Sequence, residues 1–218
     1  TEGGSVSNTG GRLAEDTVLH INAIPAEGYH FTKWSDGNTD NPRAVTVDKS
    51  DISLEAQFEV NIYKLTYNVD AAEYKAYDVA YNTTITAEAN PTKEGYTFSG
   101  WDAVPETMPA KDVVVNGTFT INSYKAVFKI GEEVIDTKSI VYGEAITTPE
   151  APVKEGYTFE GWKDVPENMP ARDIEIVGSY KANIYKLTYN VDGAEYKAYD
   201  IAYNTTITAE ANPTKEGY

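Results

Sequence analysis

Three oxygen-bearing side chains at alternate positions form the clearest candidate for metal chemistry. They are Asp36, Asn38 and Asp40, in a segment rich in turn-forming residues. Calcium loops use this spacing, but they also place a bidentate glutamate at the twelfth position, and Glu55 is too distant in sequence to serve. Asx side chains equally stabilise tight turns through local hydrogen bonds. We therefore favour a plain turn, with a weak calcium site as the alternative.

Few residues of this chain are of the types that usually carry out catalysis. The chain has two histidines and no cysteine, which excludes thiolate metal sites, disulfides and cysteine nucleophiles. His20 lies in an apolar run and His30 between two aromatic residues, so both are expected on the solvent side of strands. Neither has a nucleophile nearby in sequence. We predict that the chain is not an enzyme, has no catalytic residues and needs no cofactor.

Tyrosine offers a different kind of chemistry, because it accounts for 17 of the 218 residues. Tyr77 and its equivalent Tyr199 are expected to be exposed, since the corresponding position between them holds Lys138. Exposed aromatic rings can stack on sugars or anchor protein interfaces. Cross-strand pairing on a short sheet is the structural alternative, which we favour. Tyr77 and Tyr199 are therefore possible ligand contacts.

Composition limits the partners. The chain has 34 acidic and 18 basic residues, a formal net charge of −16, and 41% of its residues are hydrophobic. This composition is typical of a folded protein, and its sign opposes binding to nucleic acid or anionic lipid. No apolar run approaches the roughly 18 residues of a membrane span, so no membrane insertion is expected. The first residues lack the pattern of a signal peptide, which indicates a mature chain or a piece of a longer one.

Internal repetition organises the chain. Residues 61–67 return as 183–189, an offset of 122 residues, and a diverged copy begins midway at Asn122. Trp101 and Trp162 are 61 residues apart, so these copies differ by no insertion. The first sixty residues are a more distant copy with a longer loop at 35–42. We divide the chain into four segments, residues 1–60, 61–121, 122–182 and 183–218.

Each repeat is expected to be mainly β. Apolar residues alternate along the first strand of each copy, which indicates one buried face. A hairpin turn follows at 70–73, and the mixed parity of the returning strand predicts a bulge near 76–77. The segment 84–90 is readable as a short helix or a strand, and two prolines predict an ordered loop at 104–112. The expected core is aromatic: Trp34, Trp101, Trp162, Tyr96, Tyr157, Phe98 and Phe159.

The fourth segment, 183–218, stops short of the position where the other copies continue into their Trp-bearing strand. It lacks two strands of the unit, so we expect a truncated repeat that cannot close its own core. Packing against a neighbour or exchange of strands between near-identical copies would order it.

The motif strings identify a family resemblance. The string 91–101, followed by 108–112 and an alternating strand at 113–119, resembles the Listeria–Bacteroides repeat, also called the internalin-type B-repeat. Residues 61–182 match it throughout and 183–218 match its first half. Residues 1–60 resemble the divergent B-repeat through the string 28–37. The copies are shorter than the internalin versions between the tryptophan and the last strand.

The resemblance implies a tandem array of small β-grasp-like repeats in a bacterial cell-surface or secreted protein, with no catalytic residues. Such repeats act as spacers, and in some cases contact the host. We therefore expect an extracellular or cell-surface stalk that presents other domains and whose main partners are its own neighbouring repeats. The alternative is an adhesin-type module that binds a host protein or glycan through exposed tyrosines and the 35–42 loop.

Overall fold

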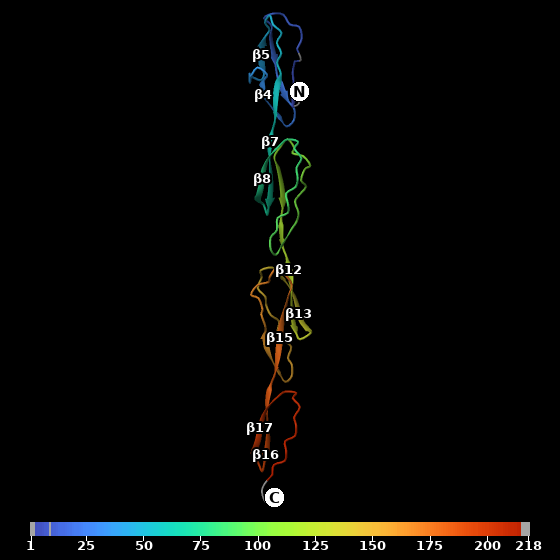
Figure 1. Ribbon diagram of the computed structural model, residues 1–218, viewed down its shortest axis with the longest axis vertical. Helices are drawn as coiled ribbons and strands as arrows, with labels where there is room; N and C mark the ends of the chain where they lie inside the picture. Colours follow the sequence, from blue (N-terminus) through green and yellow to red (C-terminus); the bar gives the residue numbers. More distant parts are fainter. Residues whose placement is uncertain (1–2, 9, 215–218) are drawn as a thin grey trace. The chain divides into compact units, whose positions relative to one another are not determined.

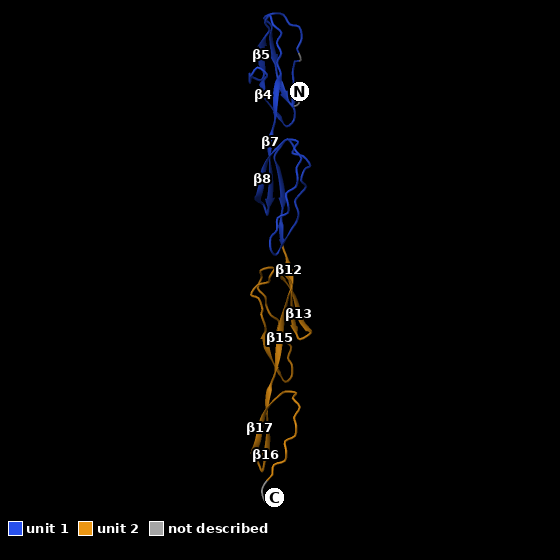
Figure 2. Ribbon diagram, in the orientation of Figure 1, with its two compact units in different colours: residues 1–120 blue, residues 121–218 orange. Residues whose placement is uncertain are grey.

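The computed structural model describes residues 3–8 and 10–214, and these form strands, turns and irregular segments without any helix. Seventeen strands are distributed over several small sheets (Figure 1). The chain divides into two compact units, residues 1–120 and 121–218 (Figure 2). The mainly β fold class expected from the sequence is confirmed, and the described residues contain strands but no helix.

The repeat at 61–121 is built around a mixed three-stranded sheet. Strand β7 (Ile62–Val69) pairs antiparallel with β8 (Ala72–Ala80) and parallel with β10 (Val113–Gly117). Strands β9 (Tyr96–Phe98) and β11 (Phe119–Ile121) form a second, two-stranded sheet. The first strand of the repeat therefore lies at the centre of the main sheet, where both of its edges are paired.

The repeat at 122–182 has the same path in one continuous sheet. Its four strands run in the order β13-β12-β15-β14, where β12 is Ser123–Ile130, β13 is Glu133–Val141, β14 is Tyr157–Trp162 and β15 is Ile174–Ala182. The parallel pairing of β12 with β15 repeats that of β7 with β10. The repeats at 61–121 and 122–182 thus share the same strand register, although their sequences differ at many surface positions.

The hairpin carries its irregularity earlier than the sequence suggests. The register between β7 and β8 shifts at Tyr67/Asn68, which leaves Tyr74 as the extra residue on β8. The predicted bulge at 76–77 is therefore wrong by two to three positions. The mixed parity has its origin beside the turn, because Asp70 and Ala71 adopt positive φ there. The segment 84–90 is irregular, with a single bridge between Thr84 and Thr107.

Each full repeat has a compact core cluster that is aliphatic as well as aromatic. Two equivalent sets of side chains are almost fully buried: Leu65, Tyr67, Met108 and Val115 in one repeat, and Ala126, Phe128, Met169 and Ile176 in the other. The methionines come from the proline-flanked loop. Met108 exchanges backbone hydrogen bonds with Asn82 and Thr83, which fixes this loop over the core.

The last residue of that loop also fixes the first strand. The Asp112 carboxylate accepts a hydrogen bond from the backbone N–H of Lys64 at 2.8 Å. Asp173 accepts the N–H of Lys125 in the same way, also at 2.8 Å. The recurring Met-Pro-Ala-Lys/Arg-Asp string is thus a structural element, because it supplies one core side chain and one acceptor for a strand amide.

The aromatic residues expected in the core divide between two places. Trp34 is fully enclosed, with 1% of its surface exposed. Trp101 and Trp162 are half-buried and pack against the core clusters, with the rings of Phe98 and Phe159 edge-on against them. The two tyrosines lie further out: Tyr96 contacts Phe119, and Tyr157 contacts Tyr203.

The first sixty residues form a different arrangement of three two-stranded sheets. Strand β1 (Gly4–Val6) pairs with β3 (Ala23–Pro25), β2 (Val18–Ile21) with β5 (Arg43–Thr46), and β4 (Tyr29–Trp34) with β6 (Ala56–Val60). All three of these pairings are antiparallel. The central parallel pair of the other repeats has no counterpart among the described residues 3–8 and 10–60.

The described part of the fourth segment, residues 183–214, forms one hairpin. Strand β16 (Ile184–Val191) pairs with β17 (Ala194–Ala202) with the same register shift as β7 and β8. None of the side chains described in this segment is buried, and residues 183–214 add no third strand to the hairpin. Among all described residues, no helix is long and apolar enough to cross a membrane.

Candidate functional site

The junction between the first two repeats brings together sequence-distant residues of unit 1. A single residue, Asn61, connects β6 to β7. Its backbone N–H donates to the carbonyl of Gly28 at 2.7 Å, and its carbonyl accepts the N–H of Tyr81 at 2.9 Å. One residue of the connection is therefore hydrogen-bonded to both repeats.

The Tyr81 ring packs against the junction and contacts two residues of the first repeat, Tyr29 and Gly28. It packs edge-to-face against Tyr29, with ring centroids 6.1 Å apart. It also covers Gly28 so closely that an added Cβ at this glycine would lie 2.1 Å from the ring. Gly28 has a φ of +77°, a conformation that favours glycine. Both the backbone conformation and the ring contact thus require glycine here.

Unit 2 contains the same arrangement between its own two segments. The N–H of Asn183 donates to Gly156 at 2.8 Å, and the N–H of Tyr203 donates to Asn183 at 2.8 Å. Tyr203 packs edge-to-face on Tyr157 at 5.6 Å, and a Cβ at Gly156 would lie 2.2 Å from its ring. We call this set of glycine, asparagine and two tyrosines the clasp.

The side chain of the clasp asparagine has a different partner in each unit. The Oδ1 atom of Asn61 lies 2.7 Å from Nδ1 of His30, whereas Oδ1 of Asn183 accepts the Thr158 hydroxyl at 2.6 Å. His30 is exposed on β4, as is His20 on β2. The clasp therefore tolerates a change of donor at this position while its backbone bonds stay the same.

From the sequence, Tyr157 was expected in the core, and neither its contact with Tyr203 nor the contact of Tyr29 with Tyr81 was predicted. The signal was present, because three kinds of residue recur together at the repeat spacing: Gly28, Gly95 and Gly156; Asn61, Asn122 and Asn183; Tyr81, Tyr142 and Tyr203. A recurring residue can serve the contact between repeats as well as the interior of each one.

The predicted ligand contact Tyr77 lies in a fixed hydrogen-bonded group on β8. Its hydroxyl donates to Glu88 at 2.6 Å, and Lys75 pairs with the other carboxylate oxygen, also at 2.6 Å. These hydrogen bonds lower the pKa of Glu88 and raise the pKa of Tyr77. The ring stands edge-on to Tyr67, and 42% of the Tyr77 surface is exposed.

The second ligand candidate, Tyr199, repeats this geometry. It donates to Glu210 at 2.6 Å, Lys197 pairs with the same carboxylate, and 39% of the tyrosine is exposed. The middle repeat has Lys138 at this position, which donates instead to the carbonyl of Thr147 at 2.8 Å. The aromatic group is therefore a property of the two near-identical copies.

The loop 35–42 is organised by its own side chains. Asp36 forms a bidentate pair with Arg43, at 2.7 and 2.5 Å. Asn38 accepts the N–H of Asp40 at 2.8 Å, and the carbonyl of Asp40 accepts the Trp34 indole N–H at 2.9 Å. The guanidinium lowers the pKa of Asp36 and neutralises the charge that a cation would need.

Metal-ligating side chains do not gather in the part of the chain that the structure describes. No set of three or more His, Cys, Asp or Glu side chains there has the geometry of a metal site.

Comparison with known proteins assigns these repeats. The family model described as the divergent InlB B-repeat domain matches residues 1–62. The model described as the Listeria-Bacteroides repeat domain matches residues 63–121, 124–173 and 185–218, which is more than half of the chain. The chain belongs to the Listeria–Bacteroides repeat family. The clasps at Asn61 and Asn183 thus join a divergent B-repeat to a Listeria–Bacteroides repeat, and one such repeat to the next.

The relatives are larger proteins. A putative Gly-rich membrane protein of Evansella cellulosilytica is 26% identical over 94% of this chain, and Internalin H of Listeria monocytogenes is 34% identical over 56% of it. The chain covers 27% and 25% of these relatives, respectively. Among solved structures, streptococcal SHIRT domains 3–4 from a cell surface protein cover 56% of this chain and 98% of their own, at 20% identity and a TM-score of 0.26.

Proposed function

We propose that this chain is a non-catalytic spacer in a cell-surface or secreted bacterial protein, where its Listeria–Bacteroides repeats hold other domains away from their attachment point. The observation that carries the proposal is the clasp, which occurs with the same backbone bonds in both units. A spacer needs joints of defined geometry between repeats, and the clasp is such a joint.

The clasp restricts bending for a physical reason. A one-residue connection has two backbone dihedrals to vary, and the N–H and carbonyl of Asn61 are both bonded. Bending at this point must break those bonds and uncover the ring of Tyr81. Repeats joined in this way extend by duplication, since each new copy needs only the same neighbour contact.

Charge supports the same role. Acidic residues outnumber basic ones in each of the four segments, and the chain has a net charge of −16. Like charge keeps copies of a protein apart in solution and on a crowded surface. Relatives described as membrane proteins favour an extracellular location at the cell envelope for the protein that contains this chain.

Distance measurements between spin labels test the joint directly, because the chain has no cysteine to interfere. We expect labels at Thr39→Cys and Lys111→Cys, both exposed positions, to give a narrow distance distribution by pulsed electron resonance. Tyr81→Ala removes the clasp ring and should broaden the distribution severalfold. Tyr74→Ala, an exposed tyrosine of the same repeat, is the matched control and should leave the width unchanged.

A broad distribution in the unmodified chain would contradict the spacer role. Equal broadening by both alanine variants would show that the width reports general loosening of the repeat and not the clasp.

A second candidate function, adhesion, is favoured by the geometry of Tyr77 and Tyr199. Both rings are exposed yet held in place by a carboxylate, and a ring that is fixed before binding loses little entropy when it stacks on a sugar. Screening the full chain on a glycan array tests this candidate. Binding should be lost in the Tyr77→Ala, Tyr199→Ala double variant and weakened in the double Phe variant, which keeps the rings but loses the hydrogen bonds that hold them. Absence of binding by the unmodified chain would remove the candidate.

A further inference from the structure

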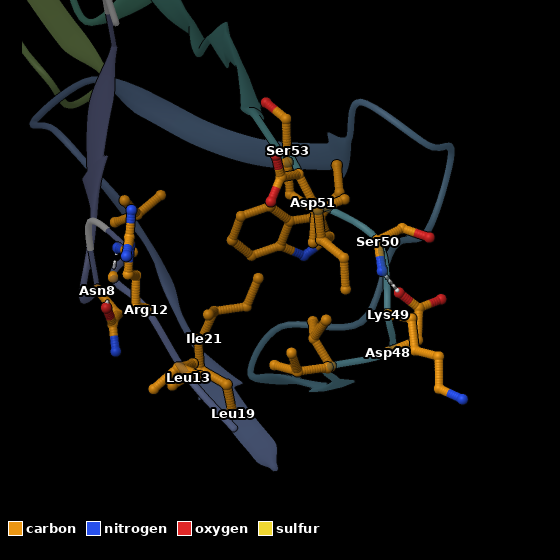
Figure 3. A pocket seen from close by; sticks show the side chains of 18 residues that line it. Asn8, Arg12, Leu13, Leu19, Ile21, Asp48, Lys49, Ser50, Asp51 and Ser53 are labelled. Carbon is orange, nitrogen blue, oxygen red and sulfur yellow. Dashed lines mark hydrogen bonds between the residues drawn. The ribbon is translucent and has the colours of Figure 1, made fainter. Parts of the chain in front are cut away.

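The divergent repeat contains a hollow that the other repeats fill with their own chain. It has a volume of about 780 Å³ and opens to solvent beside β2. Figure 3 shows Asn8, Arg12 and Leu13 on one side and Asp48, Lys49 and Ser50 on the other. Apolar side chains from four strands and from the segment before β6 form its lining: Val6, Leu19, Ile21, Trp34, Val45 and Leu54.

Comparison with the repeat at 61–121 shows what is missing. There the first strand, β7, runs for eight residues between β8 and β10 and contributes buried Leu65 and Tyr67. Here the first strand, β1, has three residues and ends at Val6. The chain turns away at Asn8, whose side-chain oxygen accepts the N–H of Gly10 at 3.0 Å.

A strand that continued β1 past Val6 would occupy a position beside the edge of β2 that does not pair with β5. Ser7 and Asn22 still bond to each other, which shows that this edge of β2 faces the position. Alternate residues of an antiparallel strand direct their backbone groups to the same edge, so Val18 and His20 face it as well. No hydrogen bond joins either residue to the described residues among 7–14.

The other side of the position is the segment before β6. Ala56 pairs with Trp34 in the divergent repeat, and Gly178 pairs with the equivalent Trp162 in the repeat at 122–182. Residues 52–56 therefore correspond to 174–178, which in turn are equivalent to β10 of the repeat at 61–121. In this repeat residues 52–54 form no strand pairing in the described structure. Asp51 corresponds to Asp112, and it lines the hollow without a bond to the described part of β1.

We propose that this hollow is a binding site for an extended segment of a partner protein, which adds as a β-strand between β2 and residues 51–55. Binding by strand addition uses backbone hydrogen bonds for affinity and side-chain pockets for selectivity. The strand β7 supplies the template for the occupant, since its large apolar side chains stand at alternate positions and point into the corresponding core. The site goes beyond the spacer role and does not depend on it.

Charge selects the kind of segment. The first sixty residues have ten acidic and four basic residues, whereas the hollow itself is lined by two of each, Asp48 and Asp51 with Arg12 and Lys49, so the acidic excess lies in the surrounding repeat. Because the whole chain is strongly acidic, a second copy would be repelled, whereas a basic segment would be attracted. The occupant we infer is therefore an extended, basic peptide segment with apolar side chains at every second position.

A peptide copied from β7 provides the probe. We expect the acetylated and amidated peptide of residues 62–69, with two lysines added at each end, to bind the full chain. Amide chemical shifts in a titration followed by NMR should change at residues 18–21 and 51–55, and the amides of Val18 and His20 should gain protection from hydrogen exchange. The same peptide N-methylated at alternate residues cannot form one ladder and should bind at least tenfold more weakly.

A matched pair of protein variants removes the site without touching the core. Ile52 is 45% exposed in the proposed site, and Ile62 is 66% exposed outside it. Ile52→Lys should weaken peptide binding at least tenfold by repulsion, while Ile62→Lys should bind like the unmodified chain. Absence of binding at millimolar peptide, equal binding of the N-methylated peptide, or shifts confined to other repeats would overturn the proposal. Dimers formed through residues 18–21 would equally overturn it, since the occupant would then be a second copy.

Discussion

The divergent repeat and the repeat that follows it, both in unit 1, reach a closed interior by different means. In the repeat at 61–121 the core surrounds Tyr67 and Met108 from a paired central strand and an overlying loop. In residues 3–60 it surrounds Trp34, held by the hydrogen bond from its indole to Asp40 in the longer loop. The comparison teaches that a long first strand and a tryptophan-capping loop are alternative solutions for a core of this size.

The difference has a functional side. The strand-centred repeat has β7 at its middle, paired on both edges, whereas the divergent repeat has a hollow beside β2, which pairs with β5. A small domain without disulfides or metal has little stability to spare. The divergent repeat, whose strands are shorter and pair over fewer residues, is therefore expected to open more readily than its neighbour.

The largest effect expected is on the tryptophan of the divergent repeat. Trp34→Ala removes the largest buried side chain there and should cost about 3–5 kcal/mol of local unfolding free energy. Trp101→Ala should cost less, because Trp101 is half-buried and Tyr67 and Met108 remain. Hydrogen exchange followed by mass spectrometry on peptides from 18–58 and 62–117 measures both; equal losses would contradict the distinction between the two cores.

The junction between these two repeats gives the next largest effect. Gly28 and Gly37 both have positive φ, but only at Gly28 would a Cβ meet a ring. Gly37→Ala should cost about 1–2 kcal/mol from backbone strain alone. Gly28→Ala should cost about 1–3 kcal/mol more, because Tyr81 must move. Thermal unfolding of the full chain gives the comparison, and matching losses would show that the ring contact does not stabilise the junction.

A smaller difference in unfolding free energy is expected between alanine variants of the two equivalent aspartates, Asp112 and Asp51. Asp112→Ala should cost about 0.5–1.5 kcal/mol, because the N–H of Lys64 loses its acceptor. Asp51→Ala should be close to neutral, since no described residue of β1 depends on it. Urea denaturation of the two single variants tests this pair, and a larger loss for Asp51→Ala would argue against the assigned correspondence.

The smallest effect concerns pH and the group around Tyr77. Because hydrogen bonds lower the pKa of Glu88, its contribution is present above the ordinary carboxyl pKa and is lost as the pH falls through the lowered value. The repeat at 61–121 should lose slightly more stability in acid than the Glu88→Gln variant does. Exchange rates of peptides from 62–88 at pH 3 and pH 7 measure this, with the middle repeat, which has Lys138 in place of Tyr77, as the internal control. Identical acid responses with and without Glu88 would contradict the assignment.

Much of this architecture was predictable from sequence because the chain contains several copies of one repeat, and comparing these copies separates buried from exposed positions. Alternating apolar residues predicted β7 and β12, and the substitution of Tyr77 by Lys138 predicted an exposed position, as observed. The motif strings also predicted the family correctly. These inferences rest on local periodicity, which a strand with one buried face must show.

Other features depend on contacts that no local pattern encodes. Met108 reads as a loop residue, and its burial follows from bonds to Asn82 and Thr83 about 25 residues earlier. The bulge at Tyr74 depends on the conformation of the turn at 70–71. The proposed strand-addition site lies where β1 ends at Val6, and no local pattern in the sequence shows that the first strand of this repeat is so short.

The most direct test of the account is whether the divergent repeat and the next repeat reorient together. Residual dipolar couplings of backbone amides, measured in the full chain, give an alignment tensor for residues 18–58 and another for residues 62–117. A fixed clasp predicts the same magnitude and orientation for the two tensors, and a clear difference after Tyr81→Ala. Two different tensors in the unmodified chain would contradict the claim that these repeats form a spacer with a rigid joint.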